Sequence, residues 1–182
     1  ISKNSIKAFY KDANEKEVKI QTINLSIDAA EKGGYDYFMA KEIFEQPKAV
    51  KDTVSPLIKE GKIQLPFKFP ENFVKNLNKI YIVACGSAFH VGVTAKYIIE
   101  DIVRVPVIVD IASEFRYRNP IIGKGDLCIF VSQSGETADT LASLREAKAR
   151  GAFTLSIVNV LFSTIARESD AVIYTNAGAE IA

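Results

Sequence analysis

Histidine, cysteine and tryptophan are scarce in this sequence, which has one His, two Cys and no Trp among 182 residues. Because His90 is the only histidine, a Ser–His–Asp catalytic triad is not favoured. The sequence also has no potential metal ligands at the spacing of a metal site. We expect His90 to face solvent or pack on its own helix. Cys85 and Cys128 lie in apolar runs, which favours two buried thiols over a disulfide and indicates a reducing, cytoplasmic setting. The sequence predicts no metal and no cofactor.

An excess of one charge and a long apolar run are also lacking. The 23 basic and 22 acidic residues leave a formal charge of +1, so the basic stripe of a nucleic-acid binder is absent. The apolar runs are short and broken by charges, which excludes a membrane span, and no signal-peptide pattern opens the chain. The balance of 48% hydrophobic and 25% charged residues is typical of a globular domain with an appendage. Because the chain begins with Ile1 and ends inside what we interpret as a functional turn, we expect it to be part of a longer protein.

Residues 6–23 have the pattern of a β-hairpin. The stretches 6–10 and 18–23 alternate apolar and polar side chains on either side of the polar run 11–17. An isolated hairpin is marginally stable in water. We therefore expect this hairpin to belong to a sheet that lies mostly outside the chain.

A helical arm is predicted after the break at Gly33 and Gly34. A helix is expected over 35–46, because apolar residues recur at i, i+3, i+4 and i+8. These residues form one apolar face: Tyr35, Phe38, Met39 and Ile43. Pro47 is expected to interrupt this helix, and a second helix is predicted over 48–59. We interpret the region as a linker that packs on its neighbours.

From residue 79 onward the pattern alternates between strand and helix. Short apolar runs rich in β-branched residues predict strands buried on both faces. These runs are 80–84, 105–111, 127–132, 154–158 and 171–175. Helical periodicity with charged outer faces spans 88–103 and 137–150. The fold class is therefore α/β, a doubly wound, flavodoxin-like, five-stranded parallel sheet of order 2-1-3-4-5, preceded by a β-hairpin and a helical linker.

Two polar loops follow the first and third strands of this sheet, where the strand order reverses and ligands bind. Gly86 and Ser87 follow strand one, and the run 132–137 follows strand three. A helix is expected to begin at about Gly135, so its unpaired amides and its dipole favour an anion there. The candidate donors to a phosphate are side chains from both loops, with Gly86 and Gly135 as supporting backbone: Ser87, Ser132, Gln133, Ser134 and Thr137.

Ser134 has a structural alternative, since it could act as the N-cap of the helix while Thr137 reaches back in the first turn. A single serine before a single helix favours the cap. Two glycine-containing polar loops that converge on one edge favour anion binding. Other phosphate motifs, the P-loop and the dinucleotide-binding fingerprint, are missing. The segment 113–118 mixes charges and aromatics, and we interpret it as a packed interface loop rather than a substrate contact.

At these loops the chain resembles the glutamine–fructose-6-phosphate aminotransferase (glucosamine-6-phosphate synthase) family. Its Ser-Gln-Ser-Gly-Glu-Thr core alone would indicate a sugar isomerase (SIS) domain. The segments that carry the wider resemblance cover nearly the whole chain: 33–35, 41–47, 112–118, 132–140, 167–170 and 176–181.

The resemblance implies three regions: residues 1–32 as the end of a glutaminase domain, 33–78 as an interdomain linker and helical arm, and 79–182 as a first SIS domain, truncated at its C-terminus. It also implies that Ser87, Ser132, Gln133, Ser134 and Thr137 hold the phosphate of fructose 6-phosphate or glucosamine 6-phosphate. The catalytic residues of the isomerase are expected beyond Ala182. A homodimer and a glutaminase domain in the same chain are the implied partners.

One position departs from the family pattern, and two other functions remain open. The family usually has Thr-Ser after the Cys-Gly of the first loop, whereas this chain has Ser87 and Ala88, so altered phosphosugar binding is expected. The alternatives are a non-catalytic SIS regulator that senses a phosphosugar and a simple isomerase or lyase of the same fold. The linker segments and the preceding hairpin argue against the regulator, and glutamine-dependent amination would distinguish the simple isomerase.

Overall fold

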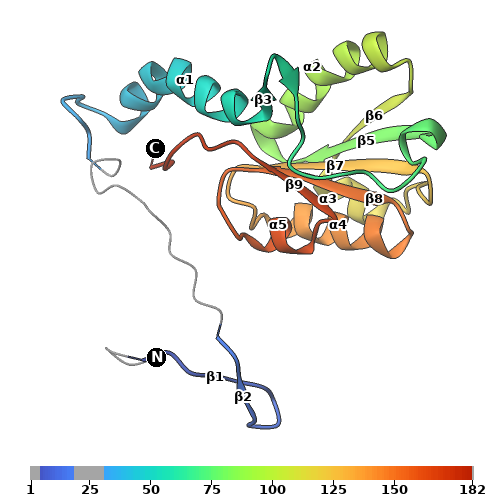
Figure 1. Cartoon of the computed structure of the whole chain (residues 1–182), viewed down its shortest axis with the longest axis horizontal. Helices are drawn as coiled ribbons and strands as arrows, with labels where there is room; N and C mark the ends of the chain where they lie inside the picture. Colours follow the sequence, from blue (N-terminus) through green and yellow to red (C-terminus); the bar gives the residue numbers. More distant parts are fainter. Residues whose placement is uncertain (1–4, 19–30, 182) are drawn as a thin grey trace.

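A parallel β-sheet forms the centre of the molecule (Figure 1). The computed structural model describes residues 5–18 and 31–181. Within these residues the sheet has five strands in the order β6-β5-β7-β8-β9, all of them parallel. The strands are β5 (Lys79–Ala84), β6 (Val107–Ile111), β7 (Asp126–Ser132), β8 (Phe153–Val158) and β9 (Ala171–Tyr174). The predicted doubly wound fold, its five strands and the order 2-1-3-4-5 are confirmed.

Helices cover both faces of the sheet (Figure 1). One face carries α2 (Gly86–Val103), and the other carries α3 (Ala112–Tyr117), α4 (Ala138–Ala149) and α5 (Thr164–Glu168). Strand β5 contributes side chains to both faces, because alternate side chains of a strand point to opposite faces. Tyr81 and Val83 belong to the cluster under α3 and α4, whereas Ile80 and Ile82 belong to the cluster under α2. Burial on both faces is why the strand sequences are continuously apolar.

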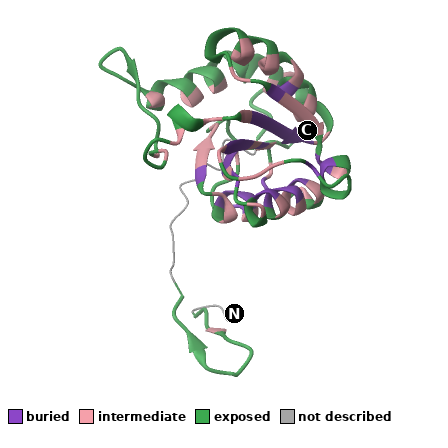
Figure 2. Cartoon of the chain, turned by 90° about the vertical axis from the view of Figure 1, so that its right-hand side faces the viewer, coloured by how far each residue is buried: buried purple, intermediate pink, exposed green. Residues whose placement is uncertain are grey.

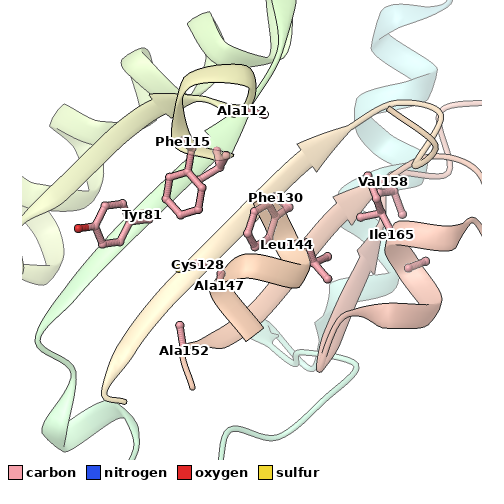
Figure 3. Close-up of a cluster of buried hydrophobic side chains, with 12 residues drawn as sticks. Tyr81, Ala112, Phe115, Cys128, Phe130, Leu144, Ala147, Ala152, Val158 and Ile165 are labelled. Carbon is pink, nitrogen blue, oxygen red and sulfur yellow. The ribbon is translucent and has the colours of Figure 1, made fainter. Parts of the chain in front are cut away.

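The cluster beneath α3, α4 and α5 is the more deeply buried of the two (Figure 3). Phe115, Phe130 and Leu144 have no exposed surface, and the Tyr81 ring packs edge-on against Phe115 at 5.9 Å between centroids. The Tyr81 hydroxyl donates to the Ile121 carbonyl at 2.8 Å, so its polar end is satisfied. Burial also raises the pKa of the Cys128 thiol to about 12. The prediction of two buried thiols is therefore met by Cys128 but not by Cys85, which follows β5 and is half-buried.

The opposite face is completed by an aromatic segment rather than by a further helix. Phe67, Phe69 and Phe73 pack with the cluster under α2. The rings of Phe69 and Phe73 lie 5.4 Å and 5.1 Å from the ring of Phe153 on β8. Residues assigned from sequence to the linker therefore contribute to the core of the sheet domain.

The helical arm differs from its prediction. One helix, α1 (Phe38–Val54), runs through Pro47, and a hairpin of β3 (Ile58–Lys59) and β4 (Lys62–Ile63) follows where the second helix was expected to end. Pro47 is exposed, so water can satisfy the carbonyl that loses its intrahelical donor. Met39 and Ile43 on the predicted apolar face are 64% and 54% exposed. The arm contacts the sheet domain through other side chains, because Thr53 bonds to the Thr175 carbonyl.

Two shorter elements also depart from the sequence analysis. Strands β1 (Ala8–Phe9) and β2 (Glu15–Lys16) form the predicted hairpin, but β2 lies within the run assigned to its turn. Residues 19–23 of the predicted second strand lie outside the described residues. The segment 113–118, interpreted as a loop, belongs mostly to α3, with Phe115 buried in the core. Figure 2 shows burial concentrated in the sheet, while the hairpin is largely exposed. No helix among the described residues is long and apolar enough to span a membrane.

Gly92 lets α2 pack closely on the sheet, which gives a testable prediction. A Cβ at this position would lie 2.9 Å from Cγ2 of Ile82 and 3.1 Å from Cγ1 of Val109. Gly92→Val is expected to lower the free energy of unfolding by about 1–3 kcal/mol through overpacking. Urea unfolding followed by circular dichroism measures this loss. Thr94→Val introduces the same side chain at an exposed site on the same helix, and an equal loss in both variants would contradict the packing argument.

Candidate functional site

A cleft of about 440 Å³ lies beyond the carboxyl ends of β7 and β8. The parallel register aligns these ends, because Ala84 pairs with Val131 and Ser132 pairs with Val158. The cleft is bordered by the first turns of α2, the ends of β7 and β8, the segment after β9 and one side of α1. Its lining residues are Glu42, Glu45, Gln46, Ala49, Ser87, Ala88, Val91, Val131, Ser132, Gln133, Ile157, Val158, Asn159, Thr175, Ala177, Gly178, Ala179 and Glu180.

The turn over 132–137 joins β7 to α4 and is organised by its own hydroxyls. The buried Ser132 Oγ accepts from the Gly135 amide at 3.1 Å and lies 3.1 Å from Thr137 Oγ1. Ser134 Oγ accepts from the Glu136 amide at 3.2 Å. These bonds curl the turn around one buried hydroxyl. The turn therefore presents a compact group of hydroxyl and amide donors beside the cleft.

The structure brings together part of the predicted site. Ser87, Ser132 and Gln133 line the cleft, while Ser134 and Thr137 lie in the same turn without lining it. Helix α4 begins at Ala138, three residues after the predicted start, and Thr137 is its N-cap residue. The predicted capping does not occur, because Thr137 occupies the N-cap position of α4 and its side chain accepts no hydrogen bond from the helix. Ser134 lies before this position. The later start leaves 132–137 free to form the tight turn.

Both predicted supporting glycines adopt backbone conformations that favour glycine. Gly86 has a φ of +57° where the chain passes from β5 into α2, and Gly135 has a φ of +65°. Gly135 also lacks space for a side chain, because a Cβ there would lie 2.0 Å from Ser163 Oγ. The 132–137 turn therefore packs tightly against the residues that precede α5.

Charge divides the cleft into two sides. Glu42, Glu45 and Glu180 line the side formed by α1 and the segment after β9. Glu42 Oε1 accepts from the Ile181 amide at 2.9 Å, and Glu45 lies 3.9 Å from the Lys41 ammonium. The side formed by β7, β8 and α2 carries hydroxyls and amides. Carboxylates repel an anion, so a phosphate is favoured on the hydroxyl side.

Comparison with known proteins identifies the fold family. The SIS domain family model matches residues 74–182. The chain belongs to the SIS domain family. It is 54% identical, over its whole length, to the glutamine–fructose-6-phosphate aminotransferase (isomerizing) of Clostridium tetani, and 51% identical over 87% of its length to that of Mycolicibacterium smegmatis. It spans 30% and 26% of the length of these two relatives.

A solved structure extends the similarity to three dimensions. The C-terminal domain of glucosamine-fructose-6-phosphate aminotransferase from Francisella tularensis aligns with a TM-score of 0.76 and 45% identity, covering 83% of this chain and 42% of that one. These matches confirm the resemblance that the sequence motifs indicated.

Two other residues singled out from the sequence, Ala88 and His90, lie on α2. Ala88 lines the cleft with a methyl group, at the position where the family pattern has a hydroxyl. His90 is exposed on α2, as expected, and its ring contacts Phe89 edge-on. Within the described residues, no group of three His, Cys, Asp or Glu side chains is arranged to hold a metal ion.

Asn159 is a cleft residue that sequence reasoning missed. Its Oδ1 accepts from Thr175 Oγ1 at 2.9 Å and from the Ala177 amide at 2.8 Å, and its Nδ2 donates to the Gly178 carbonyl at 2.6 Å. Its own amide donates to the Gln133 carbonyl at 3.0 Å. Asn159 thus joins the 132–137 turn to the segment after β9. The sequence did carry a signal for it. Asn159 directly follows the fourth predicted strand, just as the two predicted phosphate-binding loops follow the first and third strands.

Removal of the Asn159 side chain should loosen the segment that borders the cleft. Asn159→Ala deletes three hydrogen bonds, each worth about 1 kcal/mol, so the Ala177 amide is expected to exchange its hydrogen about a hundredfold faster. Hydrogen–deuterium exchange measures this rate. Asn78→Ala, at the other end of the sheet, should leave it unchanged. Equal exchange at Ala177 in wild type and Asn159→Ala would show that Asn159 does not hold the segment.

Proposed function

We propose that this chain holds the phosphate of fructose 6-phosphate within an enzyme that converts fructose 6-phosphate and L-glutamine to glucosamine 6-phosphate and glutamate. One observation carries the proposal: the hydroxyl-rich turn and the start of α2 converge on one cleft in a chain 54% identical, over its full length, to a relative named for this substrate pair. The substrate and the reaction come from the names of the relatives, and the place of the phosphate comes from the chemistry of the cleft.

The binding mode follows from the donors at the hydroxyl side. Ser87 and Ser132 offer hydroxyl donors from the cleft lining, and Gln133 offers an amide. Ser134 and Thr137 add hydroxyls from the same turn beside the cleft, while the first amides of α2 lack intrahelical partners. Hydrogen bonds to a charged acceptor are each worth about 1.5–3 kcal/mol. Several such bonds hold a phosphate dianion without a lysine or arginine. The sugar then extends toward the side bordered by Asn159, Thr175 and residues 177–180.

The proposal also assigns the regions of the chain. Residues 1–32 end a glutaminase domain, 33–78 form the linker, and 79–182 form the first of two SIS domains. The residues that perform the isomerisation lie beyond Ala182, so the part described here binds and orients. A homodimeric, cytoplasmic enzyme completes the proposal, and both of these features are expectations from the family resemblance.

Turnover tests the reaction. Full-length protein given fructose 6-phosphate and L-glutamine is expected to release glucosamine 6-phosphate and glutamate in equal amounts, measured by mass spectrometry. Fructose 6-phosphate alone serves as the control. A folded full-length protein that forms no glucosamine 6-phosphate, or forms it without glutamine, would be inconsistent with the proposed activity.

Binding tests the site. Thr137→Ala in the full-length protein is expected to weaken fructose 6-phosphate binding about tenfold or more, since one hydrogen bond to a charged acceptor is lost. Isothermal titration calorimetry measures the dissociation constant. Thr94→Ala removes a hydroxyl that bonds within α2 and should leave the constant unchanged. Unchanged binding by Thr137→Ala, or equal binding of fructose and fructose 6-phosphate by wild type, would rule out this phosphate site.

A further inference from the structure

The 132–137 turn has a second side, which faces the start of α5 rather than the cleft. The Gly135 carbonyl accepts from the Ile165 amide at 3.0 Å. Glu136 Oε1 accepts from the Thr164 amide at 2.7 Å. Ser163 lies directly over Gly135, where a Cβ would lie 2.5 Å from the Ser163 Cβ. Two successive residues of the turn therefore engage three successive residues at the start of α5.

Residues 163–165 form a firm support for the turn. Ile165 is fully buried in the core beneath α4, and Ser163 is 3% exposed. Arg167 braces the same segment, since its Nη2 donates to Thr164 Oγ1 at 3.0 Å and its Nη1 to the Phe162 carbonyl. The Thr164 amide is thus a donor in a fixed position. A carboxylate of the turn that accepts its hydrogen bond is held in place.

Glu136 is an unexpected residue in an anion-binding turn, because its charge repels a phosphate. Its carboxylate does not line the cleft, and its acceptor oxygen is bonded to Thr164 on the far side of the turn. Hydrogen bonding by the Thr164 amide holds the pKa of the Glu136 carboxyl below its ordinary value, so the group stays ionised. A carboxylate retained beside a phosphate site therefore calls for a role other than binding.

We propose that Glu136 is a positioning residue of the phosphosugar site. Its carboxylate accepts a hydrogen bond from the Thr164 amide, and this bond, here called the clasp, holds the 132–137 turn against α5 and thereby fixes the donors on the cleft side. The inference rests on the proposed function, since it concerns the same turn. The backbone between Gly135 and Thr137 cannot shift without breaking the clasp. The side chains of Ser132 and Thr137 are bonded to each other, so the clasp also holds these two donors in place.

The clasp and a simple charge effect predict opposite results for the same substitution. If Glu136 acted only through its charge, removal of the charge would tighten phosphosugar binding in every neutral variant. If Glu136 acts as a clasp, Glu136→Gln keeps an acceptor for the Thr164 amide, whereas Glu136→Ala does not. The comparison of Gln with Ala therefore separates geometry from charge.

The test uses the full-length protein and fructose 6-phosphate, with dissociation constants from isothermal titration calorimetry. Glu136→Gln is expected to bind as tightly as wild type or more tightly. Glu136→Ala is expected to bind about fivefold to tenfold more weakly, despite its lower negative charge. Glu146→Ala removes a half-buried carboxylate that pairs with Arg150 on the far part of α4, and this variant should bind like wild type.

A second pair of variants tests the donor and leaves Glu136 intact. Thr164→Pro removes the amide hydrogen at the first position of α5, where proline is tolerated, and Ser163 already has a compatible φ of −56° and ψ of 161°. It should weaken binding as Glu136→Ala does, and the double variant should be no weaker than either. Thr164→Ser keeps both the amide and the hydroxyl that accepts from Arg167, and it serves as the control.

Each outcome decides the inference. Weak binding by Glu136→Ala and Thr164→Pro, together with wild-type binding by Glu136→Gln and Thr164→Ser, supports the clasp. Wild-type binding together with equal or tighter binding by Glu136→Ala overturns it. A folded wild-type protein that does not bind fructose 6-phosphate contradicts the proposed function instead, so the two failures are distinguishable.

Discussion

The pairing of β7 with strands on both sides is the constraint on which the rest of the site depends. Because β7 is parallel to both β5 and β8, and Ala84, Val131 and Ile157 lie in one register row, the three strands end at the same edge. The chain must leave each strand there, and polar residues follow each exit: Gly86 and Ser87, the 132–137 turn, and Asn159. A shift of register would separate these exits and remove the cleft. The core on both faces therefore determines the position of the site as well as the stability of the sheet.

Electrostatics then gives this cleft a direction. The hydroxyl side lies where the strands end, and the carboxylates of Glu42, Glu45 and Glu180 lie across from it. A phosphosugar can satisfy both sides only with its phosphate at the strand ends and its neutral sugar hydroxyls near the carboxylates. Glu42 also accepts from the Ile181 amide, so the acidic side fixes α1 to the segment after β9. The same side chain thus contributes to assembly of the cleft and, in the proposed binding mode, to orientation of the ligand.

The sequence predicted the features that depend on periodicity and missed those that depend on contacts between distant segments. Strands buried on both faces are continuous apolar runs, and the sheet order placed Ser87 and Ser132 on one cleft. Helix α3 was missed because its six residues are too few for a helical period, although Phe115 anchors it in the core. Asn159 and Glu136 were missed because their roles lie in hydrogen bonds to residues 16 to 28 positions away. Pro47 was misinterpreted because its position is exposed, so water can satisfy the carbonyl that loses its donor and the helix continues.

The internal bonding of the 132–137 turn bears on how tightly such a site can bind. Ser132 already accepts from the Gly135 amide, and Ser134 from the Glu136 amide. A phosphate that takes the Gly135 and Glu136 amides as donors replaces these hydrogen bonds, so each replacement contributes less than the full energy of a new bond. The described residues that line the cleft include no lysine or arginine, so they offer a phosphate no direct ion pair to offset this. Affinity then depends on several donors acting together, and a rigid turn loses less entropy when it binds. In the proposed site, the contacts of residues 163–165 that hold the turn rigid therefore matter to binding as much as the hydroxyls themselves.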